Sequence, residues 1–307
     1  MNGNNNITSK YAKFLVVVGV LAGSSSGIFG ALTTAPSLAI GFWRLTITLP
    51  FFAIPVLIKS RDTLKSIKRR DWIFAVLAGV FLFGHYFTWF SAVKLTKVTS
   101  AVVLAALHPL VVLFCTVFIF KRKVSLGQVI AIIAALIGAS IITFADTSGS
   151  NVEAVNPVLG DICAFAAGVF MGIYFQFGNE ARTNIPGPTY VLICFTTCWI
   201  CFIISCLVTQ TPVLGYPGID YVYFVAMALV CQIGSHAILN VCLGHVDALY
   251  VSTWESGEML FATILSIIIL GQYPTALGWI GCFIVTFALI YYNYKVKKDA
   301  EKLAVNK

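Results

Sequence analysis

The chain has 307 residues, of which 59% are hydrophobic and only 10% are charged, and its mean hydropathy is +0.91. Soluble domains carry about 25% charged residues, so this composition indicates a polytopic membrane protein. No polar segment is long enough to bury a core of its own and no phosphate-binding loop occurs, which excludes a soluble catalytic or nucleotide-binding domain within this sequence. The net charge of +8 does not indicate a nucleic-acid partner, because the basic residues gather in short loops and at the chain ends.

Ten apolar segments reach the roughly 17 to 25 residues that a helix needs to cross a bilayer. In chain order they are 14–34, 38–58, 72–92, 98–120, 126–145, 158–179, 188–209, 221–243, 248–270 and 276–294. If the N-terminus is cytoplasmic, nearly all Lys and Arg residues fall on that side, and an even number of spans returns the C-terminus there. Reading the first segment as a cleaved signal peptide would leave nine spans and put the basic tail outside.

The two halves of the chain are expected to be repeats. Segment 72–143 aligns without a gap on segment 222–293, and His108 then falls on Glu258. Five spans per half is an odd number, so the halves enter the membrane from opposite sides, as in the inverted repeats of secondary transporters. The predicted organisation is a first repeat over 1–145, an external linker over 146–157, a second repeat over 158–294 and a basic cytoplasmic tail over 295–307.

Each predicted repeat opens with a pair of glycines in its first span. Gly23 and Gly27 lie in span one, and Gly168 and Gly172 lie in span six. This small-xxx-small spacing lets helix backbones approach closely. We therefore expect these four residues to serve helix packing.

Three stretches of the sequence carry a resemblance to a known family. They are FWRLTITLPFF (42–52), HPLVVLF (108–114) and ESGEMLFATILSIIILGQ (255–272). The chain resembles the drug/metabolite transporter superfamily, specifically its ten-helix EamA-type carriers, over essentially its whole length. It departs from the usual pattern at Met259, where a proline commonly follows the acid, and at Gln272, where an acid is common. The resemblance implies a carrier that exports or exchanges small metabolites by alternating access, without a cofactor.

Two acids, Glu255 and Glu258, lie within the ninth apolar segment. Ionisable groups inside a membrane usually face a cavity or a partner, and the i, i+3 spacing places these two on one helix face. Two close carboxylates cannot both ionise cheaply, so they are candidates for binding a proton or a cationic substrate group. In the alternative reading, both acids are protonated packing residues.

His108 and Arg44 are the other ionisable candidates inside predicted spans. By pseudo-symmetry His108 is expected to approach Glu258 and form a proton relay. Alternatively, it bonds a carbonyl that Pro109 leaves free. Arg44 either reaches outward to the membrane surface or holds a carboxylate in the interior, and the family resemblance favours the interior position.

Polar and aromatic pairs at i, i+4 spacing occupy two further spans. His85 and Trp89 share a face of span three, and His236 and Asn240 share a face of span eight. All four are predicted to line a central cavity, with core packing as the alternative, and Gln232 is a weaker candidate. Asp161 and Glu180 lie at span ends and are interpreted as boundary residues reached by water.

The nine cysteines predict neither disulfides nor a metal site. All of them lie in or at the edges of apolar segments, and the densest group, Cys194, Cys198 and Cys201, stacks on one helix face. A metal could bind such a group, but the preferred reading is that these cysteines are small packing residues.

The sequence thus predicts a secondary carrier of a small polar metabolite, such as an amino acid or amine, with protons as the possible coupling ion. A pH-independent exchanger or uniporter of the same fold is the alternative. A channel or scaffold is less favoured, and so is a membrane-embedded enzyme, because no metal-binding HExxH motif or recognisable nucleophile setting occurs. Short loops and basic ends predict the inner membrane of a bacterium, with lipid and the substrate as partners.

Overall fold

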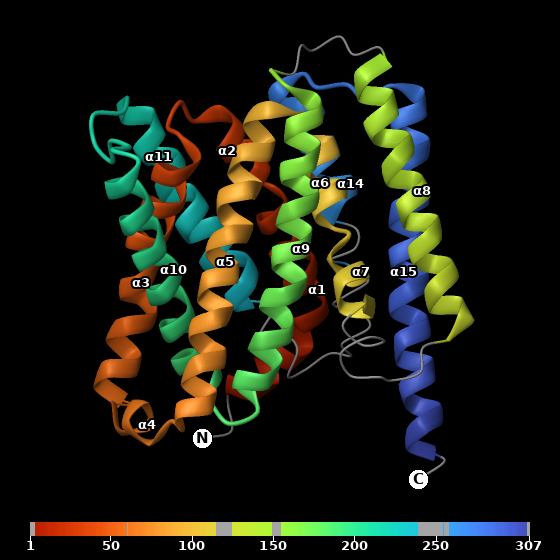
Figure 1. Ribbon diagram of the computed structural model, residues 1–307. Coiled ribbons are helices and arrows are strands. Elements are labelled where there is room, and N and C mark those ends of the chain that lie inside the picture. Colours follow the sequence, from red (N-terminus) through yellow and green to blue (C-terminus); the bar gives the residue numbers. More distant parts are fainter. Residues whose placement is uncertain are drawn as a thin grey trace.

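The computed structural model describes residues 4–59, 61–114, 125–148, 155–238, 254 and 258–305. Every element in these ranges is a helix, and most of the helices run along a common direction (Figure 1). The first half contains α1 (Asn4–Ser24), α2 (Ser26–Leu32), α3 (Ser37–Lys59), α4 (Arg61–Ser66), α5 (Arg69–Leu95), α6 (Val98–Ala105), α7 (His108–Phe114) and α8 (Leu126–Ser148). The second half contains α9 (Pro157–Arg182), α10 (Gly187–Val208), α11 (Gly218–Ala226), the π-helix η2 (Met227–Ala237), α14 (Glu258–Leu270) and α15 (Ala276–Val305).

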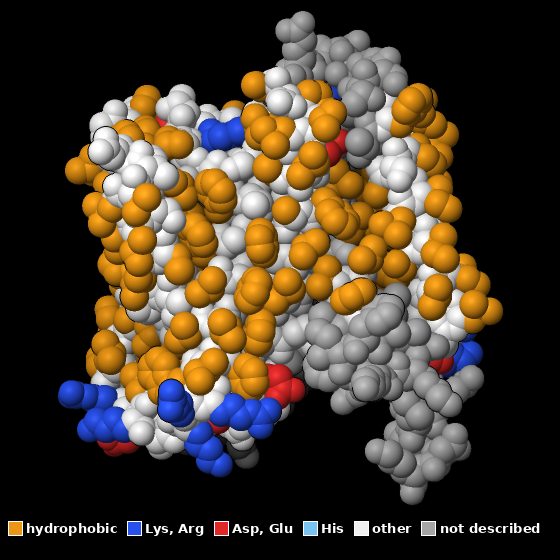
Figure 2. Space-filling view, in the orientation of Figure 1, with side chains coloured by type: hydrophobic (Ala, Val, Ile, Leu, Met, Phe, Trp, Pro, Cys, Tyr) orange, Lys and Arg blue, Asp and Glu red, His pale blue; other side chains and the backbone are white. Residues whose placement is uncertain are grey.

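Seven helical stretches of the described chain are long and apolar enough to cross a membrane. They are Tyr11–Leu32, Ser37–Lys59, Arg69–Leu95, Pro157–Arg182, Gly187–Val208, Gly218–Ser235 and Ala276–Asp299, with two shorter apolar helices at Leu126–Ile142 and Glu258–Leu270. Hydrophobic side chains cover the visible flank of the molecule, and basic side chains gather at the end where α4 lies (Figure 2). An apolar flank between polar ends is the surface of an integral membrane protein.

The predicted continuous span over 98–120 is wrong in one respect, because the helix is interrupted. Residue Ala105 ends α6, and α7 begins at His108 after a turn. Pro109 has no backbone N–H to donate to the carbonyl of Ala105, four residues earlier, so a regular helix cannot pass this point without losing a hydrogen bond. A broken helix in a membrane protein is tolerated where the freed groups find other partners.

Two polar segments also contain more helix than expected. The loop between the second and third predicted spans holds α4, whose residues are all at least partly exposed. In the predicted tail, α15 continues without a break as far as Val305. Both additions lie at the basic end of the molecule.

The centre of the fold is the packing of α5 on α9. Phe81 of α5 stacks on Phe177 of α9 with ring centroids 5.5 Å apart, and Gly84 of α5 makes room for the ring of Phe170. The buried core continues from this pair into α3, α6 and α10. Helices from both halves of the chain therefore share one hydrophobic core.

A second pair, α8 and α15, stands to one side of this core (Figure 1). A Cβ atom on Gly281 of α15 would lie only 2.7 Å from the carbonyl oxygen of Gly138 of α8. The absence of side chains at both positions lets the two backbones approach closely. Two apolar grooves of about 410 and 450 Å³ run along α8. Their apolar lining on the flank suits lipid chains better than a polar solute.

Candidate functional site

Arg44 of α3 lies inside the helix bundle, where its side chain is 2% exposed. Its Nε donates a hydrogen bond to Oε1 of Gln232 at 2.8 Å, and its Nη1 donates to Oγ of Ser26 at 3.0 Å. The guanidinium carbon lies 4.7 Å from the ring centroid of Tyr86, whose hydroxyl also donates to Oε1 of Gln232. We call Ser26, Arg44, Tyr86 and Gln232 the Arg44 cluster; it joins α2, α3, α5 and η2.

The electrostatics of this cluster are unbalanced within the described part of the chain. The guanidinium of Arg44 carries a positive charge, yet the oxygen atoms that accept its two hydrogen bonds, on Gln232 and Ser26, are neutral. The faces of two aromatic rings, Tyr86 and Phe90, supply the remaining contacts. A buried cation with neutral partners is a site at which an anionic group would bind favourably.

The π-helix η2 supplies Gln232, the residue that Arg44 of α3 bonds directly. Widened π-turns are rare and occur often at functional sites. Cys231 of η2 contacts Oγ of Ser25, the residue before α2, at 3.3 Å.

Glu258, the first residue of α14, lies against Gly23 of α1. A Cβ atom at Gly23 would be 3.4 Å from Oε1 of Glu258 and 2.8 Å from Oγ of Ser235 in η2. Ser24 also donates a hydrogen bond to the backbone carbonyl of Glu258 at 3.3 Å. The carboxylate and the Ser235 hydroxyl therefore share the space that the missing side chain of Gly23 leaves open. Glu255 lies outside the described residues.

His108 occupies the interruption between α6 and α7. Its ring packs on Phe175 of α9, with centroids 5.4 Å apart, and its imidazole interacts with the backbone of Ala105, the residue whose carbonyl Pro109 leaves free. These contacts match the alternative interpretation, in which His108 bonds the carbonyl that Pro109 leaves free. Because Glu258 packs on α1 and η2 instead, the proton relay stays a prediction.

The first glycine pair lies beside the charged site, and the second lies beside the helix interruption. Gly27 makes room for the ring of Trp89. Gly168 faces the carbonyl of Ala105, and Gly172 faces that of His108. The interrupted segment therefore rests directly on the backbone of α9.

The remaining candidates are spread around this centre. Nδ1 of His85 lies 2.9 Å from the carbonyl oxygen of Ala167, and Trp89 is 9% exposed within the core. The side chain of His236 and all of Asn240 lie outside the described part of the chain. Their predicted role at a central cavity stays a prediction.

Sequence reasoning missed two members of the Arg44 cluster. Tyr86 is hidden in the aromatic stretch GHYFTWF, and Ser26 is hidden between two packing glycines. Gln232 was only a weak candidate, although an amide inside a span needs a partner. Asp161 is also buried, with 6% exposure, and accepts a hydrogen bond from Thr96 at 2.9 Å, so its interpretation as a residue reached by water is wrong.

No group of three or more possible metal ligands occurs among the described residues. Cys194 and Cys198 of α10 are buried free thiols, and Cys201 is a half-buried one. The two halves of the chain also match one and the same family. The EamA-like transporter family matches the sequence twice, over residues 10–144 and again over 158–294.

The chain belongs to the EamA-like transporter family.

Two named transporters are similar to this EamA-like chain. "Uncharacterized transporter YxxF" of Bacillus subtilis (strain 168) is 23% identical over 272 residues, which cover 88% of this chain and 81% of the relative. An "Uncharacterized transporter" of Clostridium kluyveri is 26% identical over 226 residues, which cover 69% of this chain and 70% of the relative. The family resemblance is thus confirmed, and the protein is a membrane transporter.

A solved structure shows the same fold. It is titled "Crystal structure of protein" and superposes with a TM-score of 0.63 at 17% identity, over 92% of this chain and 96% of the other. This likeness bears on architecture alone. As an EamA-like transporter, the protein works in lipid on a small-molecule substrate.

Proposed function

We propose that this EamA-like transporter is a secondary carrier of a small zwitterionic metabolite, with amino acids as the model class. The observation that supports this most is the placement of two opposite charges, Arg44 and Glu258, against the same π-helix. Arg44 bonds Gln232 of η2 at 2.8 Å, and Glu258 and Ser235 of η2 face the same glycine. The carboxylate of one substrate molecule could bind Arg44 while its ammonium group binds Glu258.

The carboxylate of the substrate would bind by replacing one of the present hydrogen-bond partners of Arg44. Guanidinium groups bind carboxylates through two parallel hydrogen bonds, which are stronger than bonds to neutral oxygens. A substrate carboxylate would therefore displace Gln232 or Ser26 from Arg44. Because the cluster is nearly inaccessible in this conformation, with Arg44 and Gln232 each 2% exposed, the substrate must enter through another conformation.

The proposed transport cycle is alternating access between two inverted repeats of five helices, residues 1–145 and 158–294. The glycines, the helix interruption beside His108 and the π-helix support it, since transporter sites form where helices are discontinuous at the repeat interface. Ten spans with both ends in the cytoplasm would place the basic residues around α4 on the cytoplasmic side. The inner membrane of a bacterium suits these short loops.

Proton coupling through Glu258 is the second part of the proposal. The half-buried carboxyl group of Glu258 would lose its proton when the substrate ammonium binds. Proton movement would then be linked to substrate binding. In a pH-independent exchanger, Glu258 would contribute structure only.

The test is flux from proteoliposomes loaded with a pooled metabolite extract, with and without a pH gradient, analysed by mass spectrometry. Wild type is compared with Glu258→Gln, Arg44→Lys and Glu180→Gln, where Glu180 is an exposed acid far from the cluster. We expect one class of zwitterions to leave the vesicles with the gradient, and flux to fall at least about tenfold in the first two variants only. Flux that ignores the gradient and survives in Glu258→Gln would instead identify an exchanger or uniporter.

A further inference from the structure

Two buried acids lie in the first turn of corresponding helices of the two halves. Asp71 is the third residue of α5, and Asp220 is the third residue of α11. Their exposures are 4% and 0%. Each lies in the first helical turn, where free backbone N–H groups and the helix dipole stabilise a carboxylate.

Asp220 holds the connection between α2 and α3. Its carboxylate accepts hydrogen bonds from the backbone N–H of Thr34, at 3.1 and 3.2 Å to its two oxygens. It also accepts one from the hydroxyl of Thr34 at 2.6 Å. A residue of the second half therefore fixes the first connection of the first half.

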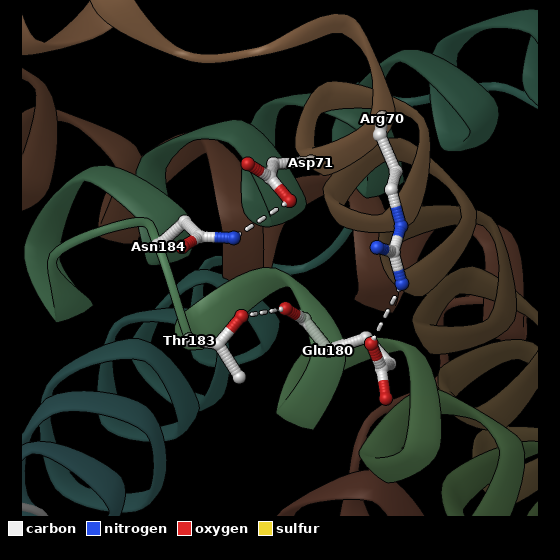
Figure 3. Close-up of polar contacts among 5 residues, drawn as sticks. All are labelled: Arg70, Asp71, Glu180, Thr183 and Asn184. Atoms are coloured by element: carbon white, nitrogen blue, oxygen red, sulfur yellow. Dashed lines mark hydrogen bonds and ion pairs between the residues drawn. The ribbon is translucent and has the colours of Figure 1, made fainter.

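Asp71 holds the connection between α9 and α10 in the same way. Its Oδ1 accepts a hydrogen bond from Nδ2 of Asn184 at 3.2 Å (Figure 3). Beside it, Arg70 pairs with Glu180 at 3.2 Å, with the two side chains 73% and 43% exposed. An exposed pair of this kind contributes little to stability, so the buried Asp71 is the stronger tie at this end.

The two ties are reciprocal. In each half, the loop after the first spanning helix is bonded by an acid of the other half. That acid lies at the start of the other half's third spanning helix. The two ties lie at opposite ends of the molecule, since α5 begins at the end of α4 and α11 begins at the far end (Figure 1). The similarity between the two halves thus includes these side-chain contacts, each of which joins a residue of one half to a residue of the other.

We propose that Asp71 and Asp220 are positioning residues that act as a pair of latches between the repeats, one at each end of the molecule. The inference rests on the alternating-access cycle proposed above. Opening one end separates the repeats there and must break the latch at that end, while the other latch holds. Asp220 is bonded by two donors of Thr34, the backbone N–H shared between its two oxygens and the hydroxyl. Asp71 accepts one hydrogen bond, from a side chain, so the end closed by Asp220 is held more firmly.

The latches are tested by amide hydrogen exchange of the substrate-free protein in lipid nanodiscs. Asp→Asn keeps the shape of the side chain but removes the charge that strengthens its hydrogen bonds. In Asp220→Asn, we expect amides of residues 33–35 to exchange at least about tenfold faster and amides of residues 183–185 to exchange more slowly. Asp71→Asn should produce the opposite pattern.

The reciprocal slowing at the distant end is the decisive readout, because a local structural tie cannot produce it. If each variant loosens only its own connection, or loosens both ends, the latches are wrong. Thr34→Ala removes the hydroxyl donor and keeps the backbone N–H, and Asn184→Ala removes the side-chain amide donor. If an aspartate variant does not fold, these two variants should give the same two patterns, with the smaller effect at Thr34. Glu180→Gln is the matched control at the α4 end and should leave both connections unchanged. Since no substrate is present, failure of the flux experiment leaves this result intact.

Discussion

The guanidinium of Arg44 and the hydroxyl of Tyr86 donate hydrogen bonds to the same atom, Oε1 of Gln232, each at 2.8 Å. One neutral acceptor thereby serves two buried donors that come from different helices of the first half. Gln232 itself belongs to the second half, so this single oxygen holds the repeats together at the proposed substrate site.

Gln232→Leu should destabilise the protein. The substitution leaves two buried donors without an acceptor, which costs about 1 to 3 kcal/mol. Thermal unfolding in detergent, followed by intrinsic fluorescence, measures the loss. An unchanged unfolding temperature would mean that the Gln232 bonds contribute nothing to the fold.

Gln232→Glu separates stability from transport. The new carboxylate would accept both hydrogen bonds and neutralise Arg44 within the cluster. We expect a folded protein that no longer exports a carboxylate-bearing substrate in the vesicle assay. Normal flux in this variant would show that Arg44 does not bind the substrate carboxylate.

Tyr86→Phe and Tyr86→Leu should distinguish the hydrogen bond from the ring contact. The first removes only the hydroxyl, at a cost of about 1 kcal/mol. The second also removes the aromatic face beneath Arg44, for about 1 to 2 kcal/mol more. Equal unfolding temperatures for the two variants would rule out a stabilising contribution from the ring.

Gly23→Ala should impair transport without preventing expression. The added methyl group would lie 2.8 Å from Oγ of Ser235, so this hydroxyl must shift, and the methyl group would touch the carboxylate of Glu258 at 3.4 Å. Adding Ser235→Ala removes the closest atom and is expected to restore much of the flux. Gly187→Ala is the control, since a Cβ atom there meets nothing within 4 Å. Full flux in Gly23→Ala alone would show that this space is not needed.

Pro109→Ala should join α6 and α7 into a more regular helix. The restored N–H can bond the carbonyl of Ala105, and a helix-interior proline costs about 3 kcal/mol. We expect a higher unfolding temperature together with slower transport, as is common when strain at a working site is relieved. A variant that is both more stable and equally active would mean that the interruption has no part in the cycle.

The membrane class and the family followed from the sequence, because apolar length and the matched motifs are local properties of the chain. Pro109 indicated an interruption after Ala105, but the uniformly hydrophobic sequence around it favoured a continuous span. The π-helix around Gln232 carries no comparable local signal.

The partners of individual side chains could not be obtained in this way. Ser26, Tyr86 and Gln232 meet Arg44 only because four helices converge. Asp71 and Asp220 gave no functional signal, since an acid at a helix start is ordinary. Their reciprocal contacts with Asn184 and Thr34 depend on the relative placement of the two halves.

The pairing of α8 with α15 has a consequence for synthesis. Helix α8 is made before its close partner α15, and α9, α10, α11, η2 and α14 lie between them in the sequence. Until α15 has been made, the surface around Gly138 has only lipid, or a neighbouring chain, to cover it. Loss of α15 would leave that surface without this partner, so we expect a chain that lacks α15 to be treated by the cell as incompletely folded.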